Sequence, residues 1–334
     1  MESPSHVAEP EAQPSRKKTD DMASRKIIID TDPGQDDAFA ILLALGSPEL
    51  EVVGVTAVAG NVPVSKTEWN ARRVLELGGR QDIRVAPGCS RPMVKSLFTA
   101  EYVHGDSGLE GCDLPEPSMP ALDIHAIDFL IDRLMAEPEG EITLCPLGPL
   151  TNIAMAMVKE PRILGRIREI VLMGGGYFEG GNTTPAAEFN IFVDPHAAHV
   201  VFTSGVPLTM VPIDCTYKAL MTPAWLEELR ALGTRTAREA AGMASFYQEY
   251  GNQKFGTDSY PLHDPCVIGY LLRPDLFQGR ACHVEIETTS PTTLGMTVVD
   301  WWNVTKRPTN CHVLRDLDNP AFYALMLERI GRLP

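Results

Sequence analysis

The sequence lacks the cysteine spacing of a zinc ribbon or a thiol redox site. Its seven cysteines lie far apart, at positions 89, 112, 145, 215, 266, 282 and 311. No two of them form a CxxC pair, and an odd number spread in this way predicts free thiols in a reducing cytoplasm. The chain also lacks an apolar run of the roughly 18 residues that span a bilayer, and its first residues lack the apolar segment of a signal peptide. We therefore expect a cytoplasmic protein without a membrane span.

Basic residues are few relative to acidic ones. The chain has 29 lysines and arginines against 44 aspartates and glutamates, which gives a formal net charge of -15. A nucleic-acid-binding surface needs a basic patch to neutralise phosphates, so this balance argues against a nucleic-acid partner. Acidic clusters can instead attract cations. With 44% hydrophobic residues, the chain can bury a sizeable core.

The order of apolar patterns predicts the fold. Residues 1–24 mix proline, serine and charge without apolar periodicity, which predicts a disordered N-terminal tail. From residue 25 to residue 334 we expect a single α/β domain with an open, mostly parallel central sheet flanked by helices, a Rossmann-like core, because short β-branched runs alternate with longer helical patterns. The predicted strands are Lys26–Asp30, Glu51–Val58, Ile83–Ala86, Glu141–Pro146, Glu169–Met173, Leu208–Ile213, His283–Glu287, Met296–Val299 and Cys311–Leu314. The predicted helices are Asp37–Leu45, Lys66–Leu77, His125–Met135, Asn152–Lys159, Asp194–Thr203, Pro223–Leu232, Thr236–Tyr250, Pro265–Leu272 and Asn319–Ile330.

An acidic cluster follows the first predicted strand. Residues 30–37, DTDPGQDD, carry four carboxylates within eight positions, just before a predicted helix. Repulsion among them favours a compensating cation, and oxygen-only ligands are typical of a hard ion such as calcium or magnesium. The proline-glycine turn inside the cluster would let Asp32 and Asp37 approach one centre. The alternative is structural, because Asp36 or Asp37 could cap the helix, whose dipole favours acids near its start.

Two later segments could add ligands. Calcium takes roughly six to eight oxygens, so the cluster alone is too small. His263 and Asp264 stand just before a predicted helix, where an aspartate is otherwise a simple cap. Glu188 and Asn190 follow a glycine-rich stretch that lets the backbone approach a ligand closely. This last segment also fits a flexible loop that ends in a capping Asp194.

Together these segments resemble the nucleoside hydrolases, the inosine-uridine preferring N-ribohydrolase family. The resemblance rests on DTDPGQDDA, GN at 60–61, LGPLTN, VLMGGG, AEFN and HDP, which follow one another in the family's order. It implies the nucleoside hydrolase fold and calcium-dependent hydrolysis of the N-glycosidic bond of ribonucleosides, with release of ribose and the free base. The family also suggests a homodimer or a homotetramer. The resemblance does not decide between purine and pyrimidine bases.

The resemblance implies roles for individual positions. The calcium ligands implied in this way are the side chains of Asp32, Asp37 and Asp264 and the backbone carbonyl of Leu147. Contacts with the ribose are implied for Asp36, Asn61, Met173, Asn182, Glu188 and Asn190. Contacts with the base are implied for His104, Phe189, Tyr247 and Tyr250, and a core position is the alternative for each aromatic ring. One departure concerns Asn182, because the segment before it is one residue longer than the expected spacing.

The implied chemistry needs a base and an acid. A bound metal makes water easier to deprotonate, and Asp32 would act as the general base that delivers hydroxide to the anomeric carbon. Early cleavage of the C–N bond would give an oxocarbenium-like sugar, which nearby carboxylates favour. His263 stands where the family's leaving-group acid lies, and a histidine pKa of about 6.5 suits that role. The alternative is a histidine that only orients Asp264.

Two other functions fit parts of the sequence. Haloacid-dehalogenase-like phosphatases also place Asp-x-Asp after their first strand, but Pro33 and the second pair of acids fit that class badly. A catalytically silent nucleoside- or ribose-binding protein would be expected to lack the base or the acid, whereas Asp32 and His263 are both present. We therefore expect an active hydrolase whose partner is a small-molecule nucleoside.

Overall fold

The central sheet is built from the apolar runs of the sequence. The computed structural model describes residues 24–334, so the predicted tail lies outside the described residues except for Ser24. Eight strands form one sheet in the order β3-β2-β1-β4-β5-β6-β12-β9. Neighbouring strands are parallel except β12 and β9, which are antiparallel. The strands of this sheet are β1 (Arg25–Thr31), β2 (Leu50–Ala57), β3 (Val85–Pro87), β4 (Ile142–Pro146), β5 (Ile167–Met173), β6 (Leu208–Val211), β9 (Phe277–Cys282) and β12 (Cys311–Leu317).

Helices and two small sheets complete the fold. The small sheets pair β7 (Leu220–Met221) with β8 (Tyr260–Pro261), and β10 (Val284–Ile286) with β11 (Thr297–Val299). The helices are α1 (Gln35–Leu45), α2 (Val64–Leu77), α3 (Glu101–His104), α4 (Ala126–Ala136), α5 (Thr151–Lys159), α6 (Phe189–Val193), α7 (Pro195–Phe202), α8 (Ile213–Thr216), α9 (Pro223–Ala231), α10 (Arg235–Phe255), α11 (Pro265–Leu272) and α12 (Asn319–Ile330), with short 3-10 helices η1 (Pro161–Gly165) and η2 (Pro274–Leu276). The predicted mostly parallel sheet with flanking helices is confirmed.

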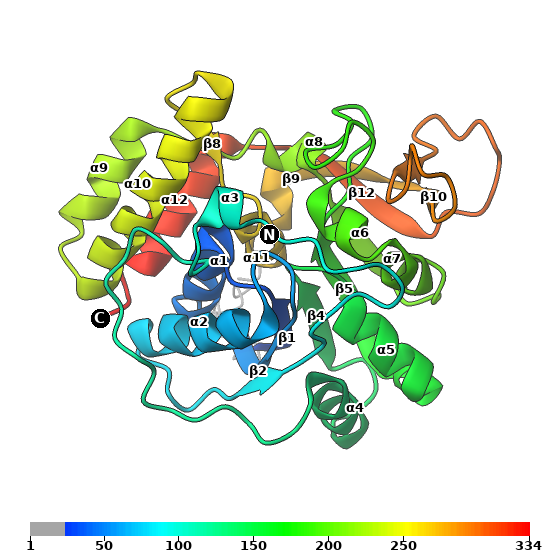
Figure 1. Ribbon diagram of the computed structural model, residues 1–334, viewed down its shortest axis with the longest axis horizontal. Helices are drawn as coiled ribbons and strands as arrows, with labels where there is room; N and C mark the ends of the chain where they lie inside the picture. Colours follow the sequence, from blue (N-terminus) through cyan, green and yellow to red (C-terminus); the bar gives the residue numbers. More distant parts are fainter. Residues whose placement is uncertain (1–23) are drawn as a thin grey trace, which may run out of the picture.

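Both faces of the sheet are covered. On β1, Ile27 and Ile29 belong to one apolar core and Ile28 to the other, and all three are fully buried. This explains why β1 reads as a continuous apolar run, since a strand buried on both faces has no polar side. Figure 1 shows α9, α10 and α12 gathered at the left of the molecule and α4, α5 and α7 at the right.

The strand order reverses next to β1. The chain runs from β1 outward through β2 to β3, and then returns to place β4 on the other side of β1. In open α/β sheets, ligands bind at such a reversal, outside the carboxyl ends of the strands. The DTDPGQDD segment leaves β1 at this edge, and LGPLTN leaves β4 beside it. The topology therefore brings these two motifs together.

Several element boundaries differ from the sequence prediction. β9 was not predicted, because it is an antiparallel edge strand with four exposed residues out of six and shows no apolar alternation. β6 ends at Val211, since Pro212 precedes a short helix. Helix α10 continues beyond Tyr250 and ends where Gly256 adopts a left-handed backbone conformation, φ 66°. The short helices α3, α6 and α8 were also missed, because one turn is too short to show a periodic pattern.

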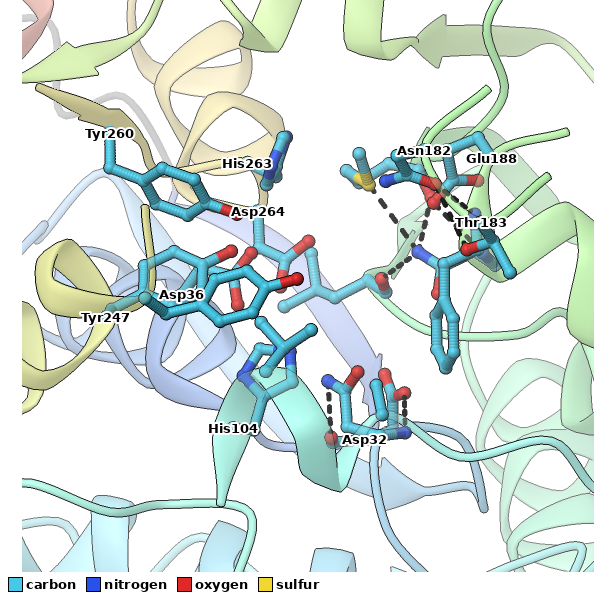
Figure 2. Close-up of a pocket in the computed structure, with 18 of the residues that line it drawn as sticks. Asp32, Asp36, His104, Asn182, Thr183, Glu188, Tyr247, Tyr260, His263 and Asp264 are labelled. Carbon is cyan, nitrogen blue, oxygen red and sulfur yellow. Dashed lines mark hydrogen bonds between the residues drawn. The ribbon is translucent and has the colours of Figure 1, made fainter. Parts of the chain in front are cut away.

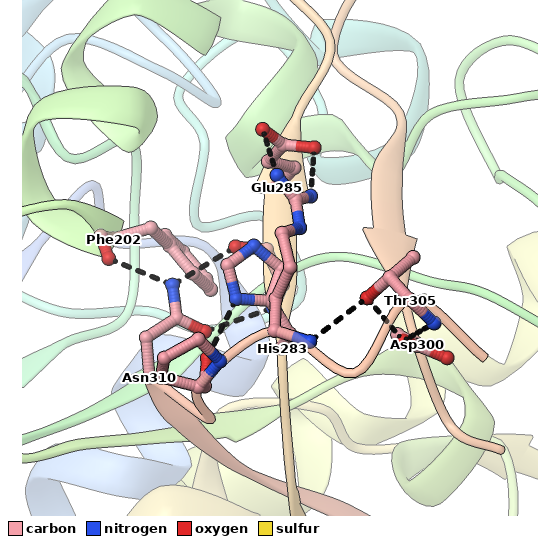
Figure 3. A network of polar contacts seen from close by, with 9 residues as sticks. Phe202, His283, Glu285, Asp300, Thr305 and Asn310 are labelled. Atoms are coloured by element: carbon pink, nitrogen blue, oxygen red, sulfur yellow. Dashed lines mark hydrogen bonds and ion pairs between the residues drawn. The ribbon is translucent and has the colours of Figure 1, made fainter. Parts of the chain in front are cut away.

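The segment between β11 and β12 is tied to its surroundings by polar contacts (Figure 3). The Asn310 side chain bonds both backbone groups of Val284, and its Nδ2 also donates to the carbonyl of Phe202. The carboxylate of Asp300 accepts from the backbone and the hydroxyl of Thr305. These bonds give the projecting β10 and β11 pair a defined position next to α7.

Two further observations bear on the composition. All seven cysteines are free thiols. None of the helices between residues 24 and 334 is long and apolar enough to cross a membrane.

The contact between Gly54 and Phe129 gives a test of the packing on β2. A Cβ at Gly54 would collide with the ring of Phe129, which α4 lays on the sheet. We expect Gly54→Ala to lower the free energy of unfolding by about 1–3 kcal/mol, because an extra carbon in a packed core forces its neighbours to move. Urea unfolding measures this change.

The control is Gly165→Ala, at a position where a Cβ meets nothing within 4 Å. Adding Phe129→Leu to Gly54→Ala should recover part of the loss, because the smaller side chain leaves room for the new carbon. Equal stability of the two glycine variants would contradict the proposed contact.

Candidate active site and metal centre

Asp37 folds the loop between β1 and α1. Its Oδ2 accepts a hydrogen bond from the backbone N–H of Gly34 at 2.9 Å, and its Oδ1 accepts from the backbone N–H of Asp32 and the hydroxyl of Thr31. Gly34 is the N-cap residue of α1, and neither Asp36 nor Asp37 takes that position. The structural alternative therefore holds in part: Asp37 satisfies a free N–H at the helix start. The Asp36 carboxylate also accepts backbone N–H groups, both at the start of α1 and from His263.

Asp264 reaches the same place from the far end of the sequence. It is the N-cap residue of α11, which packs against α1, but its side chain makes no capping bond. Instead it hydrogen-bonds the carboxylate of Asp37. Oxygens of Asp36, Asp37 and Asp264 lie within 4.8 Å of one another, and all three residues are buried. Three buried carboxylates that converge, of which Asp264 makes no capping bond, fit a cation site.

Burial and mutual repulsion disfavour the charged form of these acids. Burial raises the pKa of Asp36 to about 8, and the charge of Asp37 adds to the rise. Burial also raises the pKa of Asp37 and, together with repulsion from its two neighbours, that of Asp264. No lysine or arginine of the described chain lines the adjoining cavity. A cation is therefore the countercharge that suits this group.

Asp32 is held by the loop after β2. Its Oδ2 accepts the backbone N–H of Asn61 at 2.7 Å, and its carbonyl accepts from Nδ2 of Asn61 at 3.1 Å. A Cβ at Gly60 or at Gly148 would collide with its carboxylate oxygens. This close approach explains why glycines follow both β2 and β4. Burial raises the pKa of Asp32 well above its usual value, and repulsion from Asp37 adds to the rise.

The three carboxylates that lie close together in the structure are not the same three that were predicted as metal ligands; one of them differs. The sequence predicted Asp32, Asp37 and Asp264 together with the carbonyl of Leu147. The structure groups Asp36 with Asp37 and Asp264, because the loop after β2 engages the carboxylate of Asp32. Asp32 and Leu147 line the same cavity.

Glu188 and Asn190 form a second wall of the cavity. Glu188 caps α6, and its carboxylate accepts the N–H of Asn190 at 2.9 Å and that of Gly175 at 2.8 Å. Nδ2 of Asn190 donates to the carbonyls of Leu147, at 2.6 Å, and Met173, at 3.1 Å. These bonds join α6 to the ends of β4 and β5. The segment is therefore a short anchored helix and not the flexible loop that the sequence also allowed. Burial raises the pKa of Glu188 to about 7.

The longer loop before Asn182 is anchored by Asp214. The buried carboxylate of Asp214 accepts three hydrogen bonds from the backbone N–H groups of residues 177–179. Oδ1 of Asn182 accepts the backbone N–H of Phe189 at 2.9 Å. Asn182 and Phe189 line the cavity despite the additional residue in the loop.

Aromatic rings form the opposite half of the cavity. His104 of α3 stacks on Tyr247 of α10, with ring centroids 5.6 Å apart and planes inclined by 19°. Tyr260 meets Tyr247 edge-on at 4.6 Å and Tyr250 edge-on at 6.1 Å. Both tyrosines of α10 line the cavity, and Tyr247 is the one stacked on His104. A face of planar rings suits a planar ligand.

His263 is held by Thr216 of α8. Its Nδ1 lies 2.6 Å from the threonine hydroxyl, which is fully buried and has no other partner among the described residues. The hydroxyl hydrogen is satisfied only when it is donated to Nδ1. Neutral His263 then carries its own hydrogen on Nε2. Burial lowers the pKa of His263 to about 4, which keeps the free side chain neutral at neutral pH.

The cavity has two chemically different sides. Figure 2 shows His104, Tyr247, Tyr260 and His263 on one side and Asn182, Thr183 and Glu188 on the other. The space amounts to roughly 660 Å³, including the part open to solvent, which is in the range of small-molecule sites. The aromatic side suits a planar base, and the side with carboxylate and amide groups suits a polyhydroxyl sugar.

Nearly every predicted site residue lies on this cavity. Asp37 alone is absent from the lining and lies behind it, bonded to the loop. The lining also contains residues that the sequence did not single out: Ala100, Tyr102, Val103, Thr183, Tyr217 and Tyr260. Tyr102 and Tyr260 stand two and three positions before the two histidines of the cavity, a spacing that could have indicated them. No motif marks Tyr217.

Known proteins resemble the chain over nearly its whole length. Residues 27–324 match the model of the family described as inosine-uridine preferring nucleoside hydrolase. A pyrimidine-specific ribonucleoside hydrolase of Photobacterium profundum is 46% identical over 309 residues, which cover 92% of this chain and 99% of that protein. An uncharacterized protein of Schizosaccharomyces pombe is 50% identical over 309 residues, 92% of this chain and 100% of its own. Among solved structures, a purine-preferring ribonucleoside hydrolase from Gardnerella vaginalis has a TM-score of 0.86 at 33% identity, covering 92% of this chain and 98% of that one. A plant nucleoside hydrolase has a TM-score of 0.85 at 33% identity, covering 92% and 99%.

The raised carboxyl pKa values predict how pH acts on the metal-free protein. Folded Asp36 and Glu188, with pKa values of about 8 and about 7, hold protons that the unfolded chain releases near pH 4. The unfolded state therefore binds fewer protons, and the free energy of unfolding falls as pH rises from about 5 to about 8. We expect a lower Tm at pH 8 than at pH 5.5 in chelator-treated protein, measured by calorimetry, and recovery of most of the difference when calcium is added.

Asp264→Asn is the matched variant, because it removes one of the three grouped carboxylates and keeps the shape of the side chain. It should reduce both the pH dependence and the effect of calcium on Tm. A Tm of metal-free protein that rises over this pH range would contradict the assignment.

Proposed function

We propose that this chain, which belongs to the inosine-uridine preferring nucleoside hydrolase family and hydrolyses the N-glycosidic bond of ribonucleosides, requires calcium and acts on pyrimidine ribonucleosides. The choice of pyrimidines is supported by relatives named pyrimidine-specific, which are 46% and 44% identical over 309 residues. The purine-preferring enzyme of known structure is 33% identical. The phosphatase alternative is wrong, since the family match covers residues 27–324.

The position of Asp264 carries the metal proposal. It stands where an aspartate would cap a helix, yet its carboxylate meets those of Asp36 and Asp37. The proposed ligands are Asp32, Asp37, Asp264 and the carbonyl of Leu147, and Asp36 is a further oxygen donor for the same ion or for the ribose. Carboxylate and carbonyl oxygens are the donors that calcium prefers. When bound, calcium would make a water easier to deprotonate and bind ribose hydroxyls.

Asp32 is the proposed general base. The Asn61 N–H and the glycines at 60 and 148 fix its carboxylate at the edge of the cavity. Asp32 takes a proton from the attacking water, and the resulting hydroxide adds to the anomeric carbon. Asp32 has to be ionised for this step. Burial raises its pKa, and the positive charge of a cation held by the neighbouring carboxylates would oppose that rise.

The side of the cavity around α6 is proposed to hold the ribose. Glu188 and Asn190 are fixed by bonds to backbone groups, and Asn182 lies beside them, so hydroxyl groups meet preset acceptors and donors. As the C–N bond breaks, the sugar gains positive charge, which the carboxylates of Glu188 and Asp36 favour.

His263 is the proposed donor to the leaving base. Thr216 holds Nδ1, and so the Nε2–H group is the one available to the base. The base gains negative charge as the C–N bond breaks, which favours the protonated imidazole against the effect of burial. The electron pair of that bond leaves with the base. His263, once it has taken a second proton from solvent, gives its Nε2 proton to the base and returns to the neutral form.

The test of the proposed function is release of ribose from uridine, cytidine, inosine and adenosine. We expect reducing sugar only with metal, lost after treatment with a chelator and regained with calcium, and kcat/KM at least about tenfold higher for the pyrimidine nucleosides, which corresponds to about 1.4 kcal/mol. Asp32→Asn should lower kcat about 100-fold or more, because it removes the base.

Asp275→Asn, which changes an exposed acid paired with Arg273, is the control and should leave kcat unchanged. Calcium binding without ribose release from any nucleoside would contradict hydrolysis and favour a binding protein. Release without metal would contradict the calcium requirement alone.

Thr216→Val tests the role of the threonine hydroxyl. It keeps the shape of the side chain but no longer donates to Nδ1, so His263 can place its hydrogen on either nitrogen. We expect kcat to fall about tenfold with little change in KM, because the lost interaction acts on the leaving base. Thr216→Ser should restore kcat, and an equal loss in both variants would indicate a packing effect.

A further inference from the structure

Gln35 connects the acidic loop to α3. It is the first residue of α1 and is fully buried. Its Nε2 donates to the backbone carbonyl of His104 at 3.1 Å and to that of Glu110 at 3.2 Å. Its Oε1 lies 2.6 Å from Nδ1 of the His104 ring. One side chain therefore holds both the backbone and the imidazole of His104.

The two donated bonds fix the orientation of the Gln35 amide. Backbone carbonyls only accept hydrogen bonds, so the group that faces the two carbonyls has to be the NH2 group. The amide oxygen then faces the imidazole, and an amide oxygen also only accepts. Nδ1 of His104 therefore carries the hydrogen, and neutral His104 has its lone pair on Nε2.

The packing keeps the His104 ring in this place. Tyr247 stacks on the ring, and a Cβ at Gly34 would collide with it. Among the residues whose side chains the structure describes, none bonds Nε2 of His104, yet this atom is not among the polar atoms sealed from solvent. His104 lines the cavity, on the side that Figure 2 shows it sharing with His263. The lone pair therefore faces the cavity.

We propose that Gln35 is a positioning residue that sets His104 as a hydrogen-bond acceptor for an N–H group of the nucleobase. The inference rests on the proposed function, because it names what the same cavity recognises on its substrate. Thr216 gives His263 the opposite character, with an N–H group on Nε2. One acceptor and one donor together match the edge of a base in which an N–H group neighbours a carbonyl, as in uracil.

Electrostatics keep the acceptor available. Burial, with a smaller contribution from positive charge on His263, lowers the pKa of His104 to about 3. His104 is therefore neutral near neutral pH, and its Nε2 can accept a hydrogen bond. His104 binds the base in this way, while His263 donates to it.

The first experiment measures the tautomer of His104 in the calcium-loaded full-length protein. Long-range proton-nitrogen correlation spectra of 15N-histidine-labelled protein separate Nδ1–H from Nε2–H among the eight histidines. The spectrum of His104→Gln identifies the His104 signals. We expect Nδ1–H in the wild type and in Gln35→Glu, whose carboxylate still accepts from Nδ1. We expect a mixture or Nε2–H in Gln35→Met, which offers no acceptor of that kind.

Activity separates this role from simple anchoring of α3. Gln35→Glu and Gln35→Met both disrupt the bonds to the two backbone carbonyls, so anchoring alone predicts the same loss in both. Tautomer control predicts that kcat/KM for uridine, at saturating calcium, falls about 10- to 100-fold in Gln35→Met and is largely retained in Gln35→Glu. Thr216→Val is the matched control, because it removes the partner of the other histidine and should leave the His104 tautomer unchanged.

The second experiment identifies the group that His104 binds. Methylation of N3 removes an N–H group from uridine, whereas methylation of C5 adds the same bulk without removing a donor. We expect kcat/KM for 3-methyluridine to be about 10- to 100-fold below that for 5-methyluridine. Equal values would overturn the base as the partner of His104.

The outcomes distinguish this inference from the proposed function. The tautomer is measured before any substrate is added, so an Nε2–H signal for His104 in an active enzyme would overturn the inference alone. A protein with Nδ1–H on His104 that hydrolyses no nucleoside would instead contradict the proposed function.

Discussion

Buried negative charge without a basic partner is the constraint on which the site depends. Asp36, Asp37 and Asp264 meet beside β1, and no lysine or arginine of the described chain lines the adjoining cavity. Such a group is costly in a folded protein unless it binds protons or a cation. The fold tolerates it because Asp37 also satisfies backbone groups of the loop, so that one carboxylate serves both the turn and the site. Stability and metal binding are therefore linked through the same side chains.

Hydrogen-bond partners behind the cavity set the chemical character of its two histidines. His104 meets an amide oxygen and His263 meets a hydroxyl, and these partners favour hydrogens on opposite ring nitrogens. Burial lowers the pKa of both rings, so both are neutral in the free protein at neutral pH. The two histidines therefore differ in tautomer and not in charge. Gln35 and Thr216 do not belong to the cavity lining, yet they decide what its histidines offer to a ligand.

Most of the fold could be predicted because its elements are local patterns. Strands buried on both faces read as continuous apolar runs, as β1 does, and the helices with several turns showed their periodicity. α12 matches its predicted bounds of Asn319–Ile330. The prediction failed where the pattern is weak or brief, as in the polar edge strand β9 and the one-turn helices α3, α6 and α8, because tertiary neighbours and not periodicity stabilise them.

The sequence by itself determined the chemical groups of the site, because carboxylates crowded into DTDPGQDD and the pair at 263–264 are readable without coordinates. Only the tertiary structure decided which of them meet. It grouped Asp36 with Asp264 and placed the Asp32 carboxylate against the loop after β2, since α11 packs on α1 while β2 pairs with β1. It also showed that Asp264 does not cap its helix. Contacts between residues more than 200 positions apart depend on strand order and helix packing, and no local spacing encodes them.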